Sequence, residues 1–391
     1  MSKWYREHPL GCVGGDRKEK WICKDSNDNI IDEAEIAITI GKKTDLLALK
    51  KRVLSEIKEQ IKYFKRTRKE LYAVPDYEAV DVCPVCDARV VDSEEKVVIY
   101  GAKYSQCKKC SHVYVVNRAS KKAIGEFYLS NVNYASTYTD KEMIDFRTNK
   151  IAMPWVDWMV KTYKEVHGTL PRRILDVGSG AGHFVKACRK SGLEAEGIEL
   201  SQPSRKFAKD CLEIDLHGGD FVEDFCKFEN VDVVTFWGLL EHTPNPLKIV
   251  QTAHELLASK KSALMIAKLP RWDSLSTAIQ CIISDSVIRH LDPMGHIMCF
   301  TDASAATLFK RGGFSPKAAW YYGMDIYELL MQIGVHTGNL DVLTASGDII
   351  MKLQDYLDHS CYSDSLTLAG VPESKRSPGF RVILRAISAT R

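Results

Sequence analysis

The sequence predicts an α/β protein: a doubly wound parallel sheet, preceded by a long helix and a small metal-binding module. Three observations lead to this prediction. Short apolar runs alternate with helical patterns over residues 169–391, as expected for parallel strands joined by crossover helices. Cysteines form two Cys-x-x-Cys pairs between residues 83 and 110. Apolar residues recur at three-, four- and seven-residue spacing through residues 44–72, which indicates an amphipathic helix.

Composition limits the classes of protein to consider. The 391 residues are 45% hydrophobic and 27% charged, with a net charge of +3. So small a charge gives no support for a protein-wide nucleic-acid surface. The sequence contains no run of about 18 apolar residues and no apolar signal-peptide core at its N-terminus, so we expect no membrane span and a cytoplasmic location. In that reducing compartment the 12 cysteines are expected to be thiols or metal ligands.

Residues 1–75 are predicted to be an N-terminal extension, whose clearest element is the helix at 44–72. Thr44 is a suitable N-cap for this helix. We expect its apolar stripe to pack on the same chain or on a second copy, in a homodimer. The basic run at 62–69 supports an alternative, an RNA-binding arm, but glutamates are interspersed along the helix and favour packing.

Residues 76–118 are predicted to be a zinc ribbon. Twenty residues separate its two cysteine pairs, and apolar segments at 97–100 and 113–116 are expected to be hairpin arms. Four thiolates in two such pairs match tetrahedral Zn²⁺ coordination and leave no position open for catalysis. We therefore expect a structural Zn²⁺, with a redox Cys-x-x-Cys as the alternative. The predicted ligands are Cys83, Cys86, Cys107 and Cys110.

Residues 119–168 are expected to be a helical linker, with a helix over 140–168, and the sheet domain occupies 169–391. Apolar runs predict its strands in order: 173–177, 194–198, a third leading to Gly219, 231–236, 263–268, 317–321 and 381–387.

A glycine-rich turn follows the first of these strands. Asp176 ends the strand, and Gly178, Gly180 and Gly182 follow it in the pattern D-x-G-x-G-x-G. The dinucleotide fingerprint G-x-G-x-x-G fails in both possible registers. Glu199 ends the second strand, where an acid accepts hydrogen bonds from a ribose diol in doubly wound folds. Its alternative role is to cap the helix expected to begin near Ser201.

The pattern D-x-G-x-G-x-G resembles motif I of class I S-adenosylmethionine (SAM) methyltransferases. The run 231–246, with its Leu-Leu-Glu-His and two prolines, resembles motif IV of methyltransferases of the ubiquinone-biosynthesis type. This resemblance covers about residues 172–314. It implies a Rossmann-like seven-stranded methyltransferase sheet whose last strand is antiparallel, with residues 119–168 as a lid over the SAM pocket. The residues that the resemblance implies as SAM contacts are Asp176, Gly178, Gly180, Gly182, Glu199, Asp220, Phe221 and Trp237.

The resemblance implies transfer of a methyl group, and some acceptors must lose a proton when they react. His242 and His296 are the candidate bases, because both are expected in loops at the carboxyl edge of the sheet. For His242 a structural role, orienting the loop after the fourth strand, is the alternative. The segment 271–295 is expected to contribute to the acceptor pocket.

The leading hypothesis is a SAM-dependent methyltransferase that acts on a small molecule. Zinc-bearing relatives in this group include sugar C-methyltransferases, so a nucleotide-sugar or glycan acceptor is preferred. The alternative is an RNA methyltransferase that grips RNA with the ribbon and the basic helix. Against it, the N-P-P-[YF] motif of amino-directed nucleic-acid enzymes is absent at 237–240. A third hypothesis is a non-catalytic protein that retains SAM.

Overall fold

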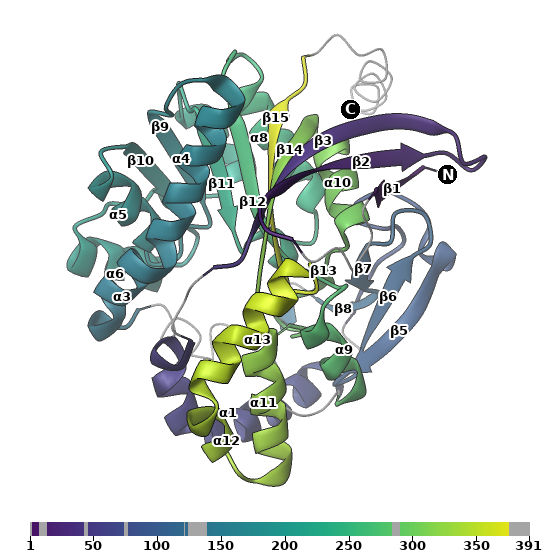
Figure 1. Cartoon of the computed structure of the whole chain (residues 1–391), viewed down its shortest axis with the longest axis vertical. Helices are drawn as coiled ribbons and strands as arrows, with labels where there is room; N and C mark the ends of the chain where they lie inside the picture. The colour runs from purple at the N-terminus through teal and green to yellow at the C-terminus, as the bar shows by residue number, and fades with distance from the viewer. Residues whose placement is uncertain are drawn as a thin grey trace.

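A computed structural model describes residues 2–7, 14–42, 46–73, 77–120, 122–123, 139–283 and 290–374. Its largest element is a nine-stranded sheet that runs through the middle of the molecule (Figure 1). In spatial order the strands are β1 (Lys3–Arg6), β2 (Arg17–Lys24), β3 (Ile30–Ile40), β14 (Phe314–Tyr322), β15 (Ser365–Pro372), β12 (Leu264–Pro270), β11 (Val233–Trp237), β9 (Arg173–Val177) and β10 (Glu194–Ile198).

The half of the sheet from β14 to β10 has the predicted α/β architecture. Strands β10, β9, β11 and β12 are parallel, and β15 lies antiparallel between β12 and β14. The predicted strands at 173–177 and 194–198 coincide with β9 and β10. Those at 231–236, 263–268 and 317–321 largely overlap β11, β12 and β14.

The sheet differs from the expected seven strands in two ways. The predicted third strand is reduced to an isolated parallel bridge between His217 and Ile198. The antiparallel strand is β15, whereas the segment 381–387 predicted for that role lies outside the described residues. Three N-terminal strands also extend the sheet beyond β14.

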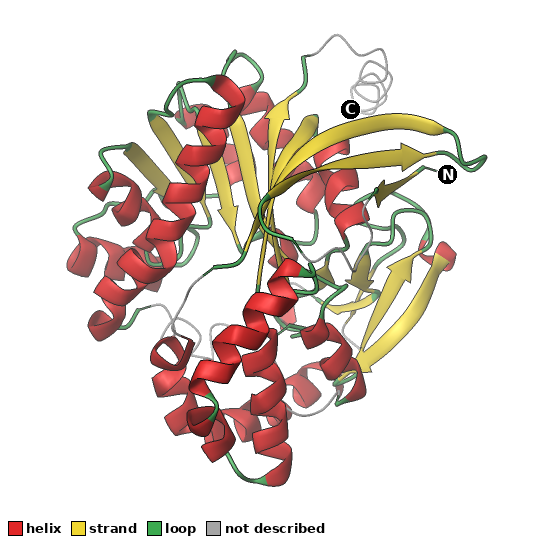
Figure 2. Ribbon diagram, viewed as in Figure 1, coloured by secondary structure: helices red, strands yellow, loops and turns green. Residues whose placement is uncertain are grey.

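Helices cover both faces of the sheet (Figure 2). On one face, the core combines sheet residues with α4 (Met153–His167), α5 (His183–Lys190) and α6 (Gln202–Leu212). On the other, it combines them with α7 (Phe221–Asp224), α8 (Pro246–Leu257) and α10 (Asp302–Arg311). Side-chain caps fix where these helices begin: Asn245 caps α8, and Thr301 forms a capping box with Ser304 at α10. Before α4, the chain forms η3 (Lys141–Met143), α3 (Ile144–Phe146) and a π-helix (Arg147–Ala152).

The N-terminal strands belong to the same sheet as the predicted domain at 169–391. β3 pairs in parallel with β14, so that Thr39 lies opposite Trp320. In β2 and β3 alternate residues are buried, among them Trp21, Ile36 and Ile38, which is the period of a half-buried strand. The division of the chain at residues 75, 118 and 168 stays a prediction.

The predicted ribbon forms a sheet of its own with β5 (Ser93–Ile99), β6 (Ala102–Cys107) and β7 (Val113–Val115). Both predicted hairpin arms are strands, but β6 lies between them and pairs with each. A fourth strand, β13 (Met298–Cys299), pairs with β7 and comes from the chain just before α10. Strands β4 (Tyr77–Ala79) and β8 (Asn117–Ala119) pair beside this sheet, and η1 (Val90–Asp92) precedes β5.

A group of helices lies near the end of the sheet where β11 and β12 terminate (Figure 1). It contains α1 (Leu46–Ala73), α9 (Leu275–Ile282), α11 (Asp325–Thr337), α12 (Asp341–Ala345) and α13 (Gly347–His359). Ile57 and Ile61 of α1 pack in one apolar cluster with residues of α11, α12 and α13. These two residues of the α1 stripe therefore pack on their own chain, in agreement with one of the two expected arrangements. None of the described helices is both long and apolar enough to cross a bilayer.

Candidate functional site

The glycine turn between β9 and α5 adopts a left-handed backbone at each of its three glycines. Their φ angles are 73° at Gly178, 53° at Gly180 and 79° at Gly182, values that residues with a Cβ atom rarely adopt. A Cβ at Gly178 would lie 2.9 Å from a methyl group of Leu239, whereas a Cβ at Gly180 would meet no atom within 4 Å. The turn is therefore packed from one side and leaves open space over Gly180.

Two acids hold this turn in place. Asp176 is buried, and Thr235 of β11 donates a hydrogen bond to its carboxylate at 2.8 Å. Burial raises the pKa of Asp176 to about 7. Glu199 accepts one hydrogen bond from the Gly180 N–H at 2.8 Å and another from the Ser201 N–H at 2.7 Å. The helix α6 is capped by the side chain of Ser201 and not by Glu199, which instead joins the glycine turn to the residue that begins the helix. Contact of either acid with SAM stays a prediction.

The next two predicted SAM contacts lie after the His217 bridge. Asp220 is exposed and caps α7, accepting a hydrogen bond from the Val222 N–H at 2.7 Å. Phe221 is buried, and its ring packs edge-on against Phe236 with centroids 6.0 Å apart. Phe221 is therefore a core residue in this structure, and its contact with SAM stays a prediction.

Trp237, at the end of β11, lies in an aromatic cluster. Its indole stacks on that of Trp155 in α4, with centroids 4.6 Å apart and planes 6° apart, and also contacts Phe184 beside the glycine turn. The indole N–H of Trp237 is buried, and no described residue accepts a hydrogen bond from it. A buried donor of this kind normally has a partner, so the cluster fits a site for a polar ligand.

The two candidate bases lie together. The imidazoles of His242, in the 3-10 helix η6 (Leu240–His242), and His296 have centroids 4.9 Å apart. Glu241 is buried beside them, and one carboxylate oxygen of Glu241 is 3.9 Å from Nε2 of His242. The three residues offer nitrogen and oxygen atoms within 4.8 Å of one another, an arrangement suited to proton transfer or to cation binding.

The tautomer of His296 follows from its partner. Nδ1 of His296 lies 2.9 Å from the carbonyl oxygen of His290, and because a carbonyl can only accept, Nδ1 carries the proton. The lone pair of Nε2 is then available as a proton acceptor. Burial, together with the nearby His242, lowers the pKa of His296 to about 4, so the ring is neutral at physiological pH.

The ribbon fixes the backbone that carries His296. The Tyr104 hydroxyl of β6 donates to the His296 carbonyl at 2.9 Å, and the Val115 N–H donates to the Ile297 carbonyl at 3.0 Å. The pairing of β7 with β13 continues this attachment. The metal-binding module and the candidate base are thus parts of one hydrogen-bonded unit.

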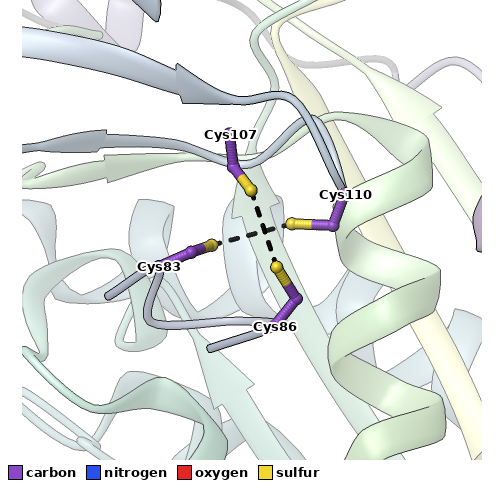
Figure 3. A group of neighbouring side chains, drawn as sticks. All are labelled: Cys83, Cys86, Cys107 and Cys110. Carbon is purple, nitrogen blue, oxygen red and sulfur yellow. Dashed lines mark hydrogen bonds between the residues drawn. The ribbon is translucent and has the colours of Figure 1, made fainter. Parts of the chain in front are cut away.

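Figure 3 shows the four predicted metal ligands pointing toward one another from two chain turns. Their side chains are buried, and the sulfur of Cys83 is 3.7 Å from that of Cys110 and that of Cys86 is 3.5 Å from that of Cys107. Zn–S bonds of about 2.3 Å in tetrahedral geometry place sulfurs roughly 3.8 Å apart. The thiols therefore fit one tetrahedral metal ion and not a disulfide, whose S–S bond is about 2 Å.

The sequence patterns did not indicate two residues that lie near Trp237. Trp155 falls in the predicted helical linker, and the only signal for it is that an aromatic residue precedes the first strand. Lys42 follows β3, in a segment without any motif. Its ammonium lies 4.7 Å from the ring centroid of Trp155.

The fold and the site place the protein in a structural class. It is a doubly wound α/β protein with a glycine turn and a strand-end acid at the carboxyl edge of its sheet. A family described as a methyltransferase domain matches residues 121–318, just over half of the 391 residues. The chain belongs to this methyltransferase-domain family, which confirms the family predicted from the sequence.

Individual proteins show more limited similarity. The ubiquinone biosynthesis O-methyltransferase of Actinobacillus pleuropneumoniae serotype 7 (strain AP76) is 35% identical over 105 residues, 24% of this chain and 44% of that protein. The protein of the same name from Bordetella avium (strain 197N) is 30% identical over 122 residues, 28% of this chain and 45% of that protein. The match thus spans less than half of these relatives.

Among solved structures, a SAM-dependent methyltransferase from Archaeoglobus fulgidus aligns with a TM-score of 0.39 and 18% identity. The alignment covers 59% of this chain and 99% of that one.

Proposed function

We propose that this protein transfers a methyl group from SAM to a small-molecule acceptor. The observation that carries the proposal is the open space over Gly180, bounded by Glu199 and lying within the segment that matches the methyltransferase family. Bound SAM supplies a methyl group already activated by its sulfonium. The glycine turn, Glu199 and Trp237 hold and orient the donor, which lowers the entropic barrier to transfer.

The histidine pair is proposed to take up the acceptor's proton. His296 offers Nε2 as the receiving atom, because its Nδ1–H is engaged by the His290 carbonyl. His242 lies against it and beside the buried Glu241. The proximity of Glu241 offsets part of the lowering of the pKa of His296. An acceptor hydroxyl or an acidic carbon between the histidines and the methyl group would then be deprotonated as it reacts.

The proposed function includes a structural Zn²⁺ held by the four cysteines and a nucleotide-sugar or glycan as the acceptor. The zinc rests on the sulfur geometry, and the acceptor rests on the resemblance to zinc-bearing sugar methyltransferases. We also propose a cytoplasmic location.

The described residues do not favour the RNA alternative. Within the basic run of α1, Arg68 is buried in an ion pair with Asp292 at 2.8 Å, and Lys62 and Arg66 each pair with a glutamate of the same helix. These charges are therefore partly neutralised within the chain. Arg68 is the residue of this run that a phosphate could not reach, because its side chain is buried, whereas the side chains of Lys62 and Arg66 are 75% and 68% exposed.

Two measurements test the proposal. Calorimetric titration with SAM should show binding at one site per chain. Incubation with isotopically labelled SAM and a cell extract should then label a metabolite or glycan, and His296→Asn should reduce that labelling by about 100-fold or more without weakening SAM binding. The absence of SAM binding would disprove the assignment, and label found only in RNA would replace the small-molecule acceptor by the RNA alternative.

A further inference from the structure

The backbone that leads to His296 is held by side chains from other parts of the chain. Helix α1 holds its middle: Arg68 forms an ion pair with Asp292 at 2.8 Å. From the same helix, the Tyr72 hydroxyl donates a hydrogen bond to the Pro293 carbonyl at 2.9 Å. The ribbon holds its end, at the His296 carbonyl. The start of this segment is held by α9.

The side chain of Gln280, in α9, binds the backbone at this start. It is buried, and its Oε1 accepts a hydrogen bond from the His290 N–H at 3.1 Å and another from the Leu291 N–H at 2.8 Å. Its Nε2 donates to the Leu291 carbonyl at 3.4 Å. Buried polar groups are costly to leave unpaired, so the two ends of this amide fix the position of the backbone.

The peptide group between His290 and Leu291 connects Gln280 to the candidate base. This peptide bond is trans, and in a trans peptide the N–H and the C=O point in opposite directions within one plane. On one side, the Leu291 N–H donates to Gln280. On the other, the His290 carbonyl accepts from Nδ1 of His296 at 2.9 Å. The hydrogen bond to Gln280 therefore sets the direction of the carbonyl that selects the tautomer of His296.

The imidazole of His290 reinforces this arrangement. Its Nε2 lies 2.8 Å from the Arg271 carbonyl, so this nitrogen carries the proton and donates it. Arg271 is itself buried, and its guanidinium forms an ion pair with Asp302 at 2.8 Å. The ring of His290 is thus bound to a fixed part of the backbone after β12. Its Nε2 does not act as a base in place of His296.

We propose that Gln280 is a positioning residue of the methyl transfer. Through the peptide between His290 and Leu291 it keeps His296 in the Nδ1–H tautomer, with the lone pair of Nε2 ready to receive the acceptor's proton. The inference rests on the proposed function and deepens it, since α9 takes part in the reaction through the backbone. In the other tautomer, Nε2 carries a proton and cannot accept one.

The test measures the tautomer and the reaction separately. Nuclear magnetic resonance of protein with isotopically labelled histidine distinguishes the two tautomers, and His296→Asn identifies the signals of His296. We expect the Nδ1–H tautomer in the wild type. Gln280→Met, which keeps the length of the side chain and removes the amide, should add a signal of the Nε2–H tautomer.

The same variant should transfer label from isotopically labelled SAM to a cell extract at least about tenfold more slowly, because a base that is not held in place loses its orientation as well as its tautomer. Its Kd for SAM should stay within about twofold of the wild type. Gln280→Glu keeps an oxygen that accepts from both N–H groups, so it should restore the wild-type tautomer and bring the rate to within about threefold. If Gln280→Met does not fold, Gln280→Asn takes its place, since its shorter amide does not reach the two N–H groups.

The matched control is Gln332→Met, which changes another buried glutamine, in α11; it should alter neither the tautomer nor the rate. The proposal is overturned if His296 of the wild type carries its proton on Nε2, or if Gln280→Met keeps the wild-type tautomer. It is also overturned if the tautomer changes without loss of rate, or if the affinity for SAM falls as much as the rate. Failure of the wild type to bind SAM would refute the proposed function by a separate readout, since the tautomer is measured without either ligand.

Discussion

At the scale of single residues, Gly180 offers the sharpest test of the donor site. Its φ angle is 53° and the space above it is open, so a long side chain would fit sterically only by occupying that space. Gly180→Arg should weaken SAM binding by about 100-fold or more, equivalent to roughly 2.7 kcal/mol. Isothermal calorimetry measures this loss directly.

The matched control for this substitution is Gly192→Arg. Gly192 also has a left-handed backbone, with φ 80°, and open surroundings, but it follows α5 at the other end of that helix. It carries the same backbone strain without touching the proposed site. Equal SAM affinities of the Gly180 and Gly192 variants would show that the glycine turn does not hold the donor.

At this scale the structure brings the four cysteines together and gives the three glycines a left-handed backbone, while their contacts with metal and SAM stay predictions. The spacing of the glycines, of Glu199 and of the cysteine pairs depends on chain segments that are close in sequence. Lys42 and Trp155 were not found, because they reach the site only through the pairing of β3 with β14 and the packing of α4 on β11. Both are long-range contacts that no local pattern encodes.

At the scale of elements, the ribbon is predicted to keep β13 in place. Cys83→Ser should release about one Zn²⁺ per chain, since structural zinc and folding are coupled. The backbone amides of β7 and β13 should then exchange hydrogen faster, because β7 ends five residues after the ligand Cys110. Elemental analysis and hydrogen-exchange mass spectrometry measure the two effects.

Cys226→Ser serves as the control for the ribbon variant, since Cys226 is an exposed thiol away from the cluster. It should leave the metal content and the exchange rates unchanged. If Cys83→Ser kept its full metal content, the four-cysteine site would be refuted. If Cys83→Ser lost metal without faster hydrogen exchange in β13, the prediction that the ribbon holds β13 and the backbone of His296 in place would be refuted.

A second prediction concerns the junction of α13 with α11. Asp358 is buried, and Gln354 donates a hydrogen bond to it at 2.8 Å. Burial raises the pKa of Asp358 to about 8, so the folded state favours the protonated acid, and this contribution to stability is lost as pH rises from about 4 toward 8. Asp358→Asn should match the wild type near pH 4 and exceed its stability at pH 8 by on the order of 1 kcal/mol or more.

Urea denaturation at the two pH values measures this difference. The control is Asp355→Asn, one turn earlier, whose carboxylate is 67% exposed and whose removal should have little effect at either pH. A stability difference for Asp358→Asn that did not grow between pH 4 and pH 8 would contradict the raised pKa.

Strands with a strong apolar pattern were predicted well. Strands whose partners lie far away in the sequence were predicted poorly. β9 and β10 were predicted at their observed bounds, since each is a short buried run beside a turn. β15 was not predicted, because Ser365–Pro372 mixes Leu366, Leu368 and Val371 with serine, threonine, glycine and proline, and its pairing with β12 and β14 is remote in sequence. The same reason explains why β1 and β2 were not foreseen.

At the scale of the whole molecule, a buried ion network joins the N-terminal strands to the rest. Glu19 accepts hydrogen bonds from Arg6 at 2.8 and 2.7 Å and from Arg17 at 2.8 Å, and Arg6 also pairs with Asp302 of α10. Glu19→Gln removes the counter-charge that Arg6 and Arg17 share and leaves Arg6 with Asp302 alone, so it should cost about 3 kcal/mol of unfolding free energy. Urea denaturation should show this loss in one cooperative transition for the whole chain.

The comparison variant is Glu35→Gln, whose carboxylate is 69% exposed in its pair with Lys18; it should change stability by no more than about 0.5 kcal/mol. A second, earlier transition in the Glu19 variant would mean that β1–β3 unfold on their own. That result would contradict the single sheet as one cooperative unit.

The parallel pairing of β3 with β14 has a consequence for how the chain folds while the ribosome synthesises it. Ala37 must pair with Ala318, so strand β3 waits for a partner that is synthesised roughly 280 residues later. At about 5–20 residues per second the wait is on the order of tens of seconds. During it β2 and β3 present an unpaired edge to other nascent chains. Their exposed positions carry alternating opposite charges, Lys18 with Glu35 and Lys20 with Glu33, and charges at strand edges discourage premature association.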